Sequence, residues 1–282
     1  MIHKKVSSLY LPLFLLTLFM LLTWPVWRWL WGEWWRNDYY SHGMLIVPIA
    51  LYLAWRRISN DREFDWSRME GDSRGLLFLG GCLAAFLFFM TDKAYFLAAL
   101  AMIGLLGGLL WTFGGSRLVR ELAFPLAFLT LMVPLPFLER ATLPLALLTG
   151  VCSGTIVRWL GVDVSVIGSA VTLPNTNLVI GAQCSGINSI LALTALTALA
   201  AYALKGPLLG RLTLFLLAIP LAMLGNILRV ANLLVVARYF GVDAAFTFYH
   251  DYSGFITFFL AFLLLIPLTK LLQCNTVRAE VL

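Results

Sequence analysis

Three side chains in the second half of the chain have the types and settings needed for thiol chemistry. Cys184 stands where a loop enters an apolar segment, Arg229 lies within another such segment, and His250 lies on the short loop before the last one. A thiolate can attack a peptide carbonyl, and a histidine can carry the proton between the thiol and a leaving amine. A guanidinium can stabilise the negative charge that develops. The set predicts a cysteine peptidase or transpeptidase with a thioester intermediate.

Cys184 has neighbours that distinguish it from the other cysteines. It lies in the stretch GAQCSGIN, residues 181–188, directly before an expected helix whose N-terminal dipole and free N–H groups favour the thiolate. Free cysteines are more often small buried hydrophobic residues, and Cys82 and Cys152 have the apolar or small neighbours typical of that role. Neither Cys-x-x-Cys nor Cys/His spacing occurs, so we expect no metal site, no cofactor and no disulfide framework.

Arg229 is expected to lie about two helical turns inside the membrane. An arginine there costs about 3 kcal/mol to insert, so a function or a partner must offset that cost. Asn226 and Asn232 flank it at intervals of three residues, and we expect this polar stripe to face the interior of a helix bundle. An arginine at a helix end can instead extend to the membrane surface, a role that suits Arg238 better.

His250 is the histidine best placed to complete such a site. Imidazole is the side chain best suited to moving protons near neutral pH. A solvated loop histidine is the simpler alternative, and no triad with the adjacent Asp251 is assumed, because neighbouring side chains rarely face each other. With Cys184 and Arg229, His250 predicts one pocket at the outer face of the membrane.

The elements that must position these residues are membrane helices. Hydrophobic residues make up 61% of the 282 residues and charged residues only 12%, whereas soluble domains carry about 25% charged residues. The pattern predicts an all-α integral membrane protein with about eight transmembrane helices. Their expected ranges are 9–27, 42–55, 75–91, 94–113, 122–138, 187–204, 212–238 and 254–272.

The distribution of basic residues orients these helices. We expect the net charge of +6 to mark cytoplasmic loops that face anionic lipid, not a nucleic-acid partner. Most of the basic residues fall in segments on one side, which predicts that both termini are cytoplasmic. Tryptophans crowd the outer end of the first helix and are expected to anchor it among the lipid headgroups. They are Trp24, Trp27, Trp29, Trp31, Trp34 and Trp35.

Two regions between the fifth and sixth predicted helices do not fit simple spans. Residues 139–161 are expected to form an outer-leaflet interfacial or re-entrant helix. Residues 162–182 are rich in Val and Ile and interrupted at Pro174, which predicts a small extracytoplasmic β-hairpin just before the helix of Cys184. We expect one polytopic membrane domain over residues 1–282, with a retained first helix and no fused C-terminal soluble domain.

In the order and placement of its motifs, the sequence resembles the exosortase/archaeosortase family of multi-span membrane proteins. The resemblance covers about residues 37–265 and rests on four stretches. These are DYYSHG at 38–43, QCSGI at 183–187, NILRV at 226–230 followed by Asn232, and His250 with Gly254.

The resemblance implies a sorting enzyme of the bacterial inner membrane with its active site on the periplasmic face. Its substrates would be exported proteins that end in a Pro-Glu-Pro-like motif, a hydrophobic helix and a basic tail (the PEP-CTERM signal). Cleavage near the motif would be followed by transfer of the new carboxyl end to an unknown envelope acceptor. Membrane lipid is the other expected partner, and many bacteria with this system make exopolysaccharide.

The resemblance also implies residue roles. Cys184 would be the nucleophile, Arg229 the stabiliser of the oxyanion or thiolate, and His250 the general acid and base. The residues expected to support the site or bind substrate are Gln183, Ser185, Gly186, Asn226, Asn232 and His42. For His42, a purely structural polar contact is an equal alternative.

Three other functions are compatible with the sequence. An intramembrane cysteine protease would hydrolyse the thioester instead of transferring it. A transporter or channel would use Arg229 and the asparagines as a solute site, but transporters more often show two related halves with broken helices, which we do not find. A non-catalytic assembly factor for envelope polysaccharide would tolerate free replacement of Cys184.

Overall fold

The computed structural model describes a predominantly helical chain with a small sheet. Its backbone is described for residues 2–60, 71–168, 170–179, 181, 184–245 and 250–278. Side chains are described for these residues except 2–9, 11, 12, 177, 250 and 251. Within these ranges, six helices are long and apolar enough to cross a membrane. The all-α membrane class is confirmed, and the number of eight spans stays a prediction.

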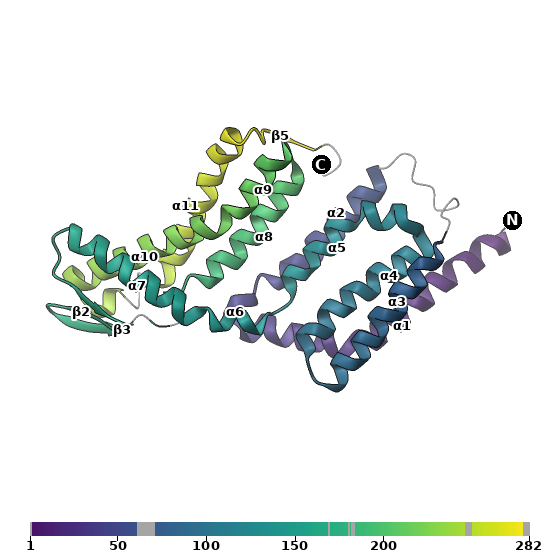
Figure 1. Cartoon of the computed structure of the whole chain (residues 1–282), viewed down its shortest axis with the longest axis horizontal. Helices are drawn as coiled ribbons and strands as arrows, with labels where there is room; N and C mark the ends of the chain where they lie inside the picture. Colours follow the sequence, from purple (N-terminus) through teal and green to yellow (C-terminus); the bar gives the residue numbers. More distant parts are fainter. Residues whose placement is uncertain are drawn as a thin grey trace. The chain divides into compact units, whose positions relative to one another are not determined.

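The chain divides into two compact units, Met1–Pro134 and Leu135–Leu282. The first unit contains α1 (Ile2–Arg36), η1 (Asp38–Tyr40), α2 (Gly43–Asn60), α3 (Ser73–Thr91), α4 (Tyr95–Glu121), α5 (Ala123–Leu129) and η3 (Thr130–Met132). The helices α3 and α4 form a closely packed antiparallel pair (Figure 1), because Gly104 of α4 lies directly against Cys82 of α3. α4 bends at Gly115, where φ is 73°, so its regular part ends close to the predicted end of the span 94–113.

The tryptophans of α1 differ in their surroundings. Trp24, Trp31 and Trp35 are exposed, as expected of residues that anchor a helix among lipid headgroups. Trp34 is 5% exposed, and its indole Nε1 donates a 2.9 Å hydrogen bond to the carbonyl of Met132. The prediction of an anchoring role is therefore wrong for Trp34, which instead fastens α1 to the end of η3.

The predicted span 122–138 is wrong, because the helix breaks within it. η3 ends at Met132, Val133 is extended with φ −87° and ψ 120°, and α6 begins at Pro136. Pro134 and Pro136 explain the break, because proline lacks an N–H group and forces the preceding residue out of the helical conformation. The division between the two units falls at the same place.

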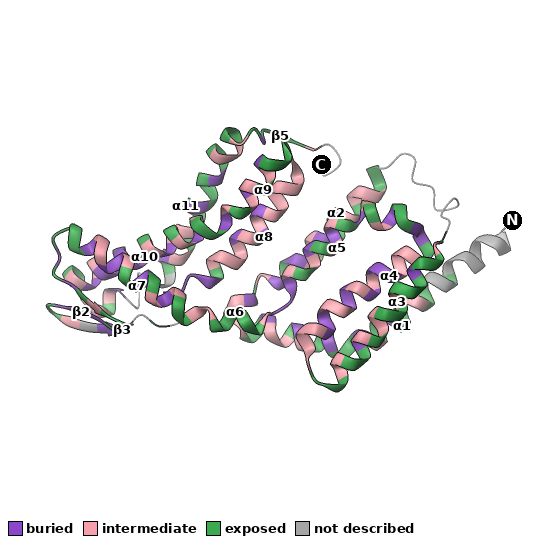
Figure 2. Cartoon of the chain, viewed as in Figure 1, coloured by how far each residue is buried: buried purple, intermediate pink, exposed green. Residues whose placement is uncertain are grey.

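The second unit is built around α10. Its helices are α6 (Pro136–Arg140), α7 (Thr142–Trp159), α8 (Ile187–Ala203), α9 (Leu208–Leu216), α10 (Ala218–Phe240) and α11 (His250–Leu271). α10 packs against α7, α8 and α11, and Figure 2 shows many more buried positions on α10 than on α11. The predicted span 212–238 covers parts of both α9 and α10. These helices meet at Leu217, because Pro220 cannot donate a bond to the carbonyl of Leu216.

α7 occupies most of the segment 139–161 and is helical, as expected. Its Thr149 contacts Asn226 in the first half of α10, and the sheet that follows α7 contacts the last turn of α10. The two helices therefore run side by side in the same direction (Figure 1). Together with α6, α7 is long and apolar enough to cross a membrane. The interfacial or re-entrant placement stays a prediction.

The described residues between 162 and 181 include a small sheet, as predicted, but with three strands instead of two. The strands β1 (Ser165–Ile167), β2 (Ala170–Leu173) and β3 (Thr176–Val179) are antiparallel in the order β1-β2-β3. Gly168, with φ of 61°, begins the additional turn that creates the third strand. In the other turn, Asn175 Nδ2 donates to the carbonyls of Ala237 (3.2 Å) and Arg238 (3.3 Å). The sheet is thereby attached to the end of α10.

A second pair of short strands joins the ends of α8 and α11. β4 (Leu204–Lys205) pairs with β5 (Thr276–Val277), and the Arg278 N–H donates a 2.8 Å hydrogen bond to the Ala203 carbonyl. Lys205 and Arg278 therefore lie at the same end of the second unit.

Candidate active site

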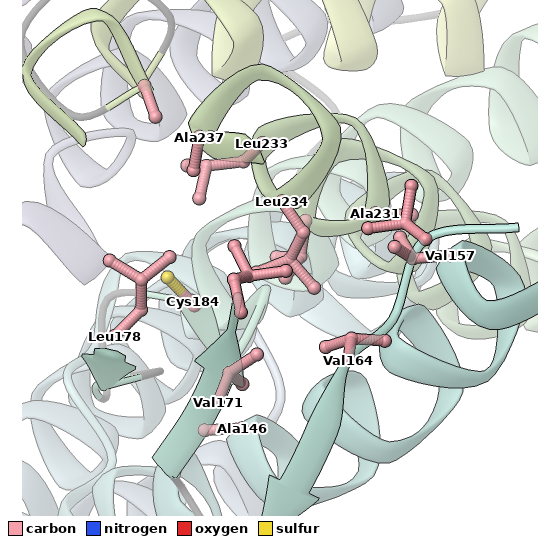
Figure 3. Close-up of a cluster of buried hydrophobic side chains, with 14 residues drawn as sticks. Ala146, Val157, Val164, Val171, Leu178, Cys184, Ala231, Leu233, Leu234 and Ala237 are labelled. Carbon is pink, nitrogen blue, oxygen red and sulfur yellow. The ribbon is translucent and has the colours of Figure 1, made fainter. Parts of the chain in front are cut away.

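Cys184 lies in a short turn between β3 and α8, and its side chain is 7% exposed. Its backbone N–H donates a 2.9 Å hydrogen bond to the Gly181 carbonyl, which closes the turn. Figure 3 shows the sulfur beside Leu178 of β3, in an apolar cluster that includes Leu234 and Ala237 of α10. The sheet and α10 therefore enclose the thiol.

Burial raises the pKa of the Cys184 thiol above its usual value of about 8.5. The positive charge of Arg229 and a hydrogen bond with the Gly181 backbone lower this pKa but do not outweigh burial. α8 begins at Ile187, so its N-terminus lies three residues after Cys184, as predicted. The expectation that it favours the thiolate stays a prediction, and burial raises the thiol pKa overall.

Asn226 connects the turn of Cys184 to two helices. It is 2% exposed, and its Nδ2 donates hydrogen bonds of 2.7 Å to the Cys184 carbonyl and 3.1 Å to the Thr149 hydroxyl of α7. Gly186 lies against the same side chain: its φ is +77°, and a Cβ there would lie 2.8 Å from Asn226 Cγ. α7 and α10 thus set the position of the nucleophile's backbone.

Arg229 lies on α10 between the buried side of the helix, which carries Asn226, and the exposed side, which carries Asn232. Its Nε donates a 3.0 Å hydrogen bond to the Ser253 hydroxyl of α11, and its charge acts on the Cys184 thiol. Each helical residue turns by about 100°, so Asn226 and Asn232 lie about 120° apart with Arg229 between them. Asn226 is buried but Asn232 is exposed. The prediction that the whole stripe faces the interior is therefore wrong for Asn232.

On the side of Asn232, the helices α7, α10 and α11 border a groove of about 750 Å³. The polar side chains that line it are Arg229, Asn232, Ser253 and Thr257, and the rest of the lining is aliphatic or glycine. Cys184 does not line this groove. Arg229 is thus the residue that both borders the groove and acts on the thiol.

A comparison with models of protein families identifies the family of this chain. The model of the transmembrane exosortases matches residues 34–267, most of the chain and all four stretches that carry the resemblance. The chain belongs to the transmembrane exosortase family. No curated protein and no solved structure matches it. With six long apolar helices among the residues that the structure describes, this exosortase is a multi-pass membrane protein.

Two predicted site residues of the exosortase lie outside what the structure describes. They are Gln183 as a whole and the side chain of His250. The backbone of α11 starts at His250, three residues before Ser253, the partner of Arg229. The role of His250 as general acid and base stays a prediction.

His42 belongs to the first unit of the exosortase, just before α2. Its imidazole is partly buried and forms hydrogen bonds with the backbone of Leu131 and Tyr39. Its ring centroid lies 6.3 Å from that of Tyr40. These contacts are typical of a structural residue, one of the two roles expected for His42. A role in substrate binding stays a prediction.

Sequence reasoning missed Thr149 and Ser253, the partners of Asn226 and Arg229. Small hydroxyl residues in apolar helices commonly bond to their own backbone, so their type alone does not mark them. Ser253 could have been found from its neighbour Gly254, which belongs to the motif of the exosortase resemblance. Ser185, which was predicted, is fully buried, and its hydroxyl accepts a 3.4 Å bond from the Ile187 N–H at the start of α8.

Replacing Gly186 by alanine is expected to destabilise the exosortase by more than about 1 kcal/mol. The left-handed conformation costs a residue with a Cβ roughly 1–2 kcal/mol, and the new methyl group would displace Asn226. Thermal unfolding in detergent measures the effect. The matched control is Gly181→Ala, where a Cβ would meet nothing within 4 Å. Equal melting temperatures for the two variants would contradict the prediction.

Alkylation of Cys184 is expected to accelerate as the pH rises beyond the usual thiol range. The reagent reacts with the thiolate, and the raised pKa keeps the thiol protonated at neutral pH. Arg229→Gln removes the charge that lowers this pKa, so the pH profile should move to higher pH. Rates of carbamidomethylation at Cys184, followed by peptide mass spectrometry, give the profile. A profile that stays in place would mean that Arg229 does not act on the thiol.

Proposed function

We propose that this exosortase is a cysteine transpeptidase that cleaves the C-terminal sorting signal of exported proteins and passes the product to an envelope acceptor. The proposal rests on one observation: the turn of a buried thiol, Cys184, is bonded to Asn226 of α10, three residues before Arg229, whose charge lowers the thiol pKa. Acyl transfer through a thioester requires a thiol and a charge stabiliser on a rigid framework. Membership of the family supports the same class of chemistry.

The reaction begins when the Cys184 proton passes to the His250 imidazole and the sulfur attacks the scissile carbonyl. The carbonyl oxygen takes the electron pair, and Arg229 stabilises its negative charge. Collapse of the tetrahedral intermediate breaks the C–N bond, and the imidazolium gives its proton to the leaving amine. An acceptor amine or hydroxyl then attacks the thioester. Its proton returns to the sulfur, which restores the Cys184 thiol.

A substrate with a hydrophobic helix next to the scissile bond fits the surroundings of Arg229. The groove between α7, α10 and α11 is almost entirely aliphatic, and its few polar groups include Arg229 and Asn232. An apolar helix can fill such a groove from within the bilayer, without leaving hydrocarbon. The scissile peptide would then enter beside the guanidinium.

We place the site on the periplasmic face of the inner membrane, with both termini in the cytoplasm. α8 leads from the turn of Cys184 to β4, and its 17 residues correspond to about 25 Å of helix. Lys205 and Arg278 lie at the β4 end. The positive-inside rule assigns that end to the cytoplasm, which supports a periplasmic position for Cys184.

Co-expression with a tagged exported protein tests the proposal. The partner carries a C-terminal Pro-Glu-Pro motif, a hydrophobic helix and a basic tail. Wild-type enzyme is expected to shorten this protein. The intact mass of the product should exceed that of the shortened protein with a free carboxyl end, and the difference should equal the mass of the attached acceptor. A free carboxylate would instead identify a hydrolytic protease. If the enzyme accumulates but shortens none of several such signals, the proposal is wrong and a transporter or assembly role gains support.

A further inference from the structure

Two buried polar side chains, Asn226 and Thr149, hold the backbone of the proposed nucleophile, Cys184. Asn226 is 2% exposed and Thr149 is fully buried. Asn226 Nδ2 donates to both the Cys184 carbonyl (2.7 Å) and the Thr149 hydroxyl (3.1 Å). The turn of Cys184, α10 and α7 therefore meet at a single side chain.

Thr149 is bonded differently from the two hydroxyl residues that follow it in α7. The hydroxyls of Ser153 and Thr155 donate to carbonyls of their own helix, in the manner usual for membrane helices. The Thr149 hydroxyl instead accepts a bond from another helix. The backbone carbonyl of Thr149 accepts a 2.6 Å hydrogen bond from the Ser153 hydroxyl, one turn further along α7.

Stability alone does not account for asparagine at position 226. Its Oδ1 is buried and has no hydrogen-bond partner within the part of the chain that the structure describes. A buried acceptor without a donor is unfavourable, and an apolar side chain of similar size would avoid that cost. The amide is therefore better explained by what its Nδ2 holds in place.

We propose that Asn226 and Thr149 are positioning residues for the nucleophile. Asn226 fixes the carbonyl of Cys184, Thr149 fixes Asn226, and the sulfur thereby keeps its position relative to Arg229. The catalytic part of this inference rests on the proposed function. It can be tested through the reactivity of the thiol, which does not depend on any substrate.

Asn226→Leu keeps the number and branching of the side-chain heavy atoms and removes both hydrogen bonds. Alkylation of Cys184 is expected to become faster, because the released turn opens, while turnover of the tagged substrate falls about 100-fold, the effect of misplacing a reacting group by about 1 Å. KM should stay close to the wild-type value, because the groove is untouched. Cys274, which is 1% exposed in the same unit, reports global unfolding, and its alkylation should not change.

Thr149 offers a milder and more conservative test. Thr149→Val removes only the hydroxyl and is expected to lower turnover about fivefold, the value of one neutral hydrogen bond. Thr149→Ser keeps the hydroxyl and should restore turnover. The matched control is Thr197→Val in α8. Thr197 is also fully buried, and its hydroxyl donates to the Leu193 carbonyl of α8 (2.9 Å) and, at 3.5 Å, to the Phe215 carbonyl of α9. Neither partner belongs to the turn of Cys184, so turnover should be unaffected.

Two results would overturn the inference. The first is an equal rise in the alkylation of Cys184 and Cys274 in Asn226→Leu, which would indicate a general structural role. The second is unchanged alkylation and turnover in both Asn226→Leu and Thr149→Val. If the wild-type enzyme processes no substrate, the proposed function fails, but the alkylation of Cys184 relative to Cys274 still decides whether the two residues position the thiol.

Discussion

Cys184→Ala is expected to abolish processing of the tagged exported protein, with a loss of at least about 10⁴-fold in rate. No other group in the proposed mechanism can form the thioester, so removal of the sulfur removes the covalent path. Cys184→Ser should be nearly as inactive, because a hydroxyl is a much weaker nucleophile than a thiol at its ordinary pKa. Immunoblots of the substrate at equal enzyme levels measure the effect.

The other cysteines provide the controls for this experiment. Cys82 of α3 and Cys152 of α7 are partly buried and have no place in the proposed site, so their alanine variants should process substrate at the wild-type rate. All variants must accumulate equally in the membrane. If Cys184→Ala then shortens the substrate as fast as the wild type, the thioester mechanism is wrong. An inactive Cys82→Ala would show that the assay reports folding.

Arg229→Gln is expected to lower kcat by about 10²–10³-fold, the usual effect of removing one group that stabilises an oxyanion. The substitution also removes the bond to Ser253 and the charge that lowers the pKa of Cys184. Arg229→Lys should recover part of the rate, because it keeps the charge but not the planar arrangement of donors. Steady-state kinetics in detergent or vesicles separates kcat from KM.

Arg238 provides a matched control on the same helix. It lies in the last turn of α10, with its guanidinium carbon 6.0 Å from the ring centroid of Tyr239, and does not line the groove. Arg238→Gln should therefore keep nearly the full rate. Equal losses in the two glutamine variants would argue for a general effect of positive charge. An Arg229→Gln enzyme with normal kcat would exclude Arg229 from the chemistry.

The chemistry-bearing residues were easier to predict than their surroundings. Cys184, Asn226 and Arg229 stand out in the sequence because polar groups are rare and costly among apolar segments, and the structure brings them together. The raised pKa of the Cys184 thiol could not be predicted. It depends on how much of the side chain the sheet and α10 cover, which is a property of tertiary packing.

The errors in the fold have local physical causes. Hydropathy averages over many residues, so it joined α5 to α6 across Pro134. The third strand was missed because four-residue strands leave little periodicity to detect. Trp34 was assigned to the headgroup region with its neighbours, because its bond to Met132 joins residues that are far apart in sequence.

The enclosure of Cys184 beneath the sheet has a consequence for the lifetime of the enzyme. Compartments outside the cytoplasm promote disulfide formation and the oxidation of exposed thiolates. A thiol that is 7% exposed and held in its protonated form is protected from both reactions. In the proposed mechanism, a peptide can reach the sulfur only if this cover opens. At rest the enzyme is therefore expected to be latent and resistant to oxidants, and to become reactive only while a bound substrate holds the sheet open.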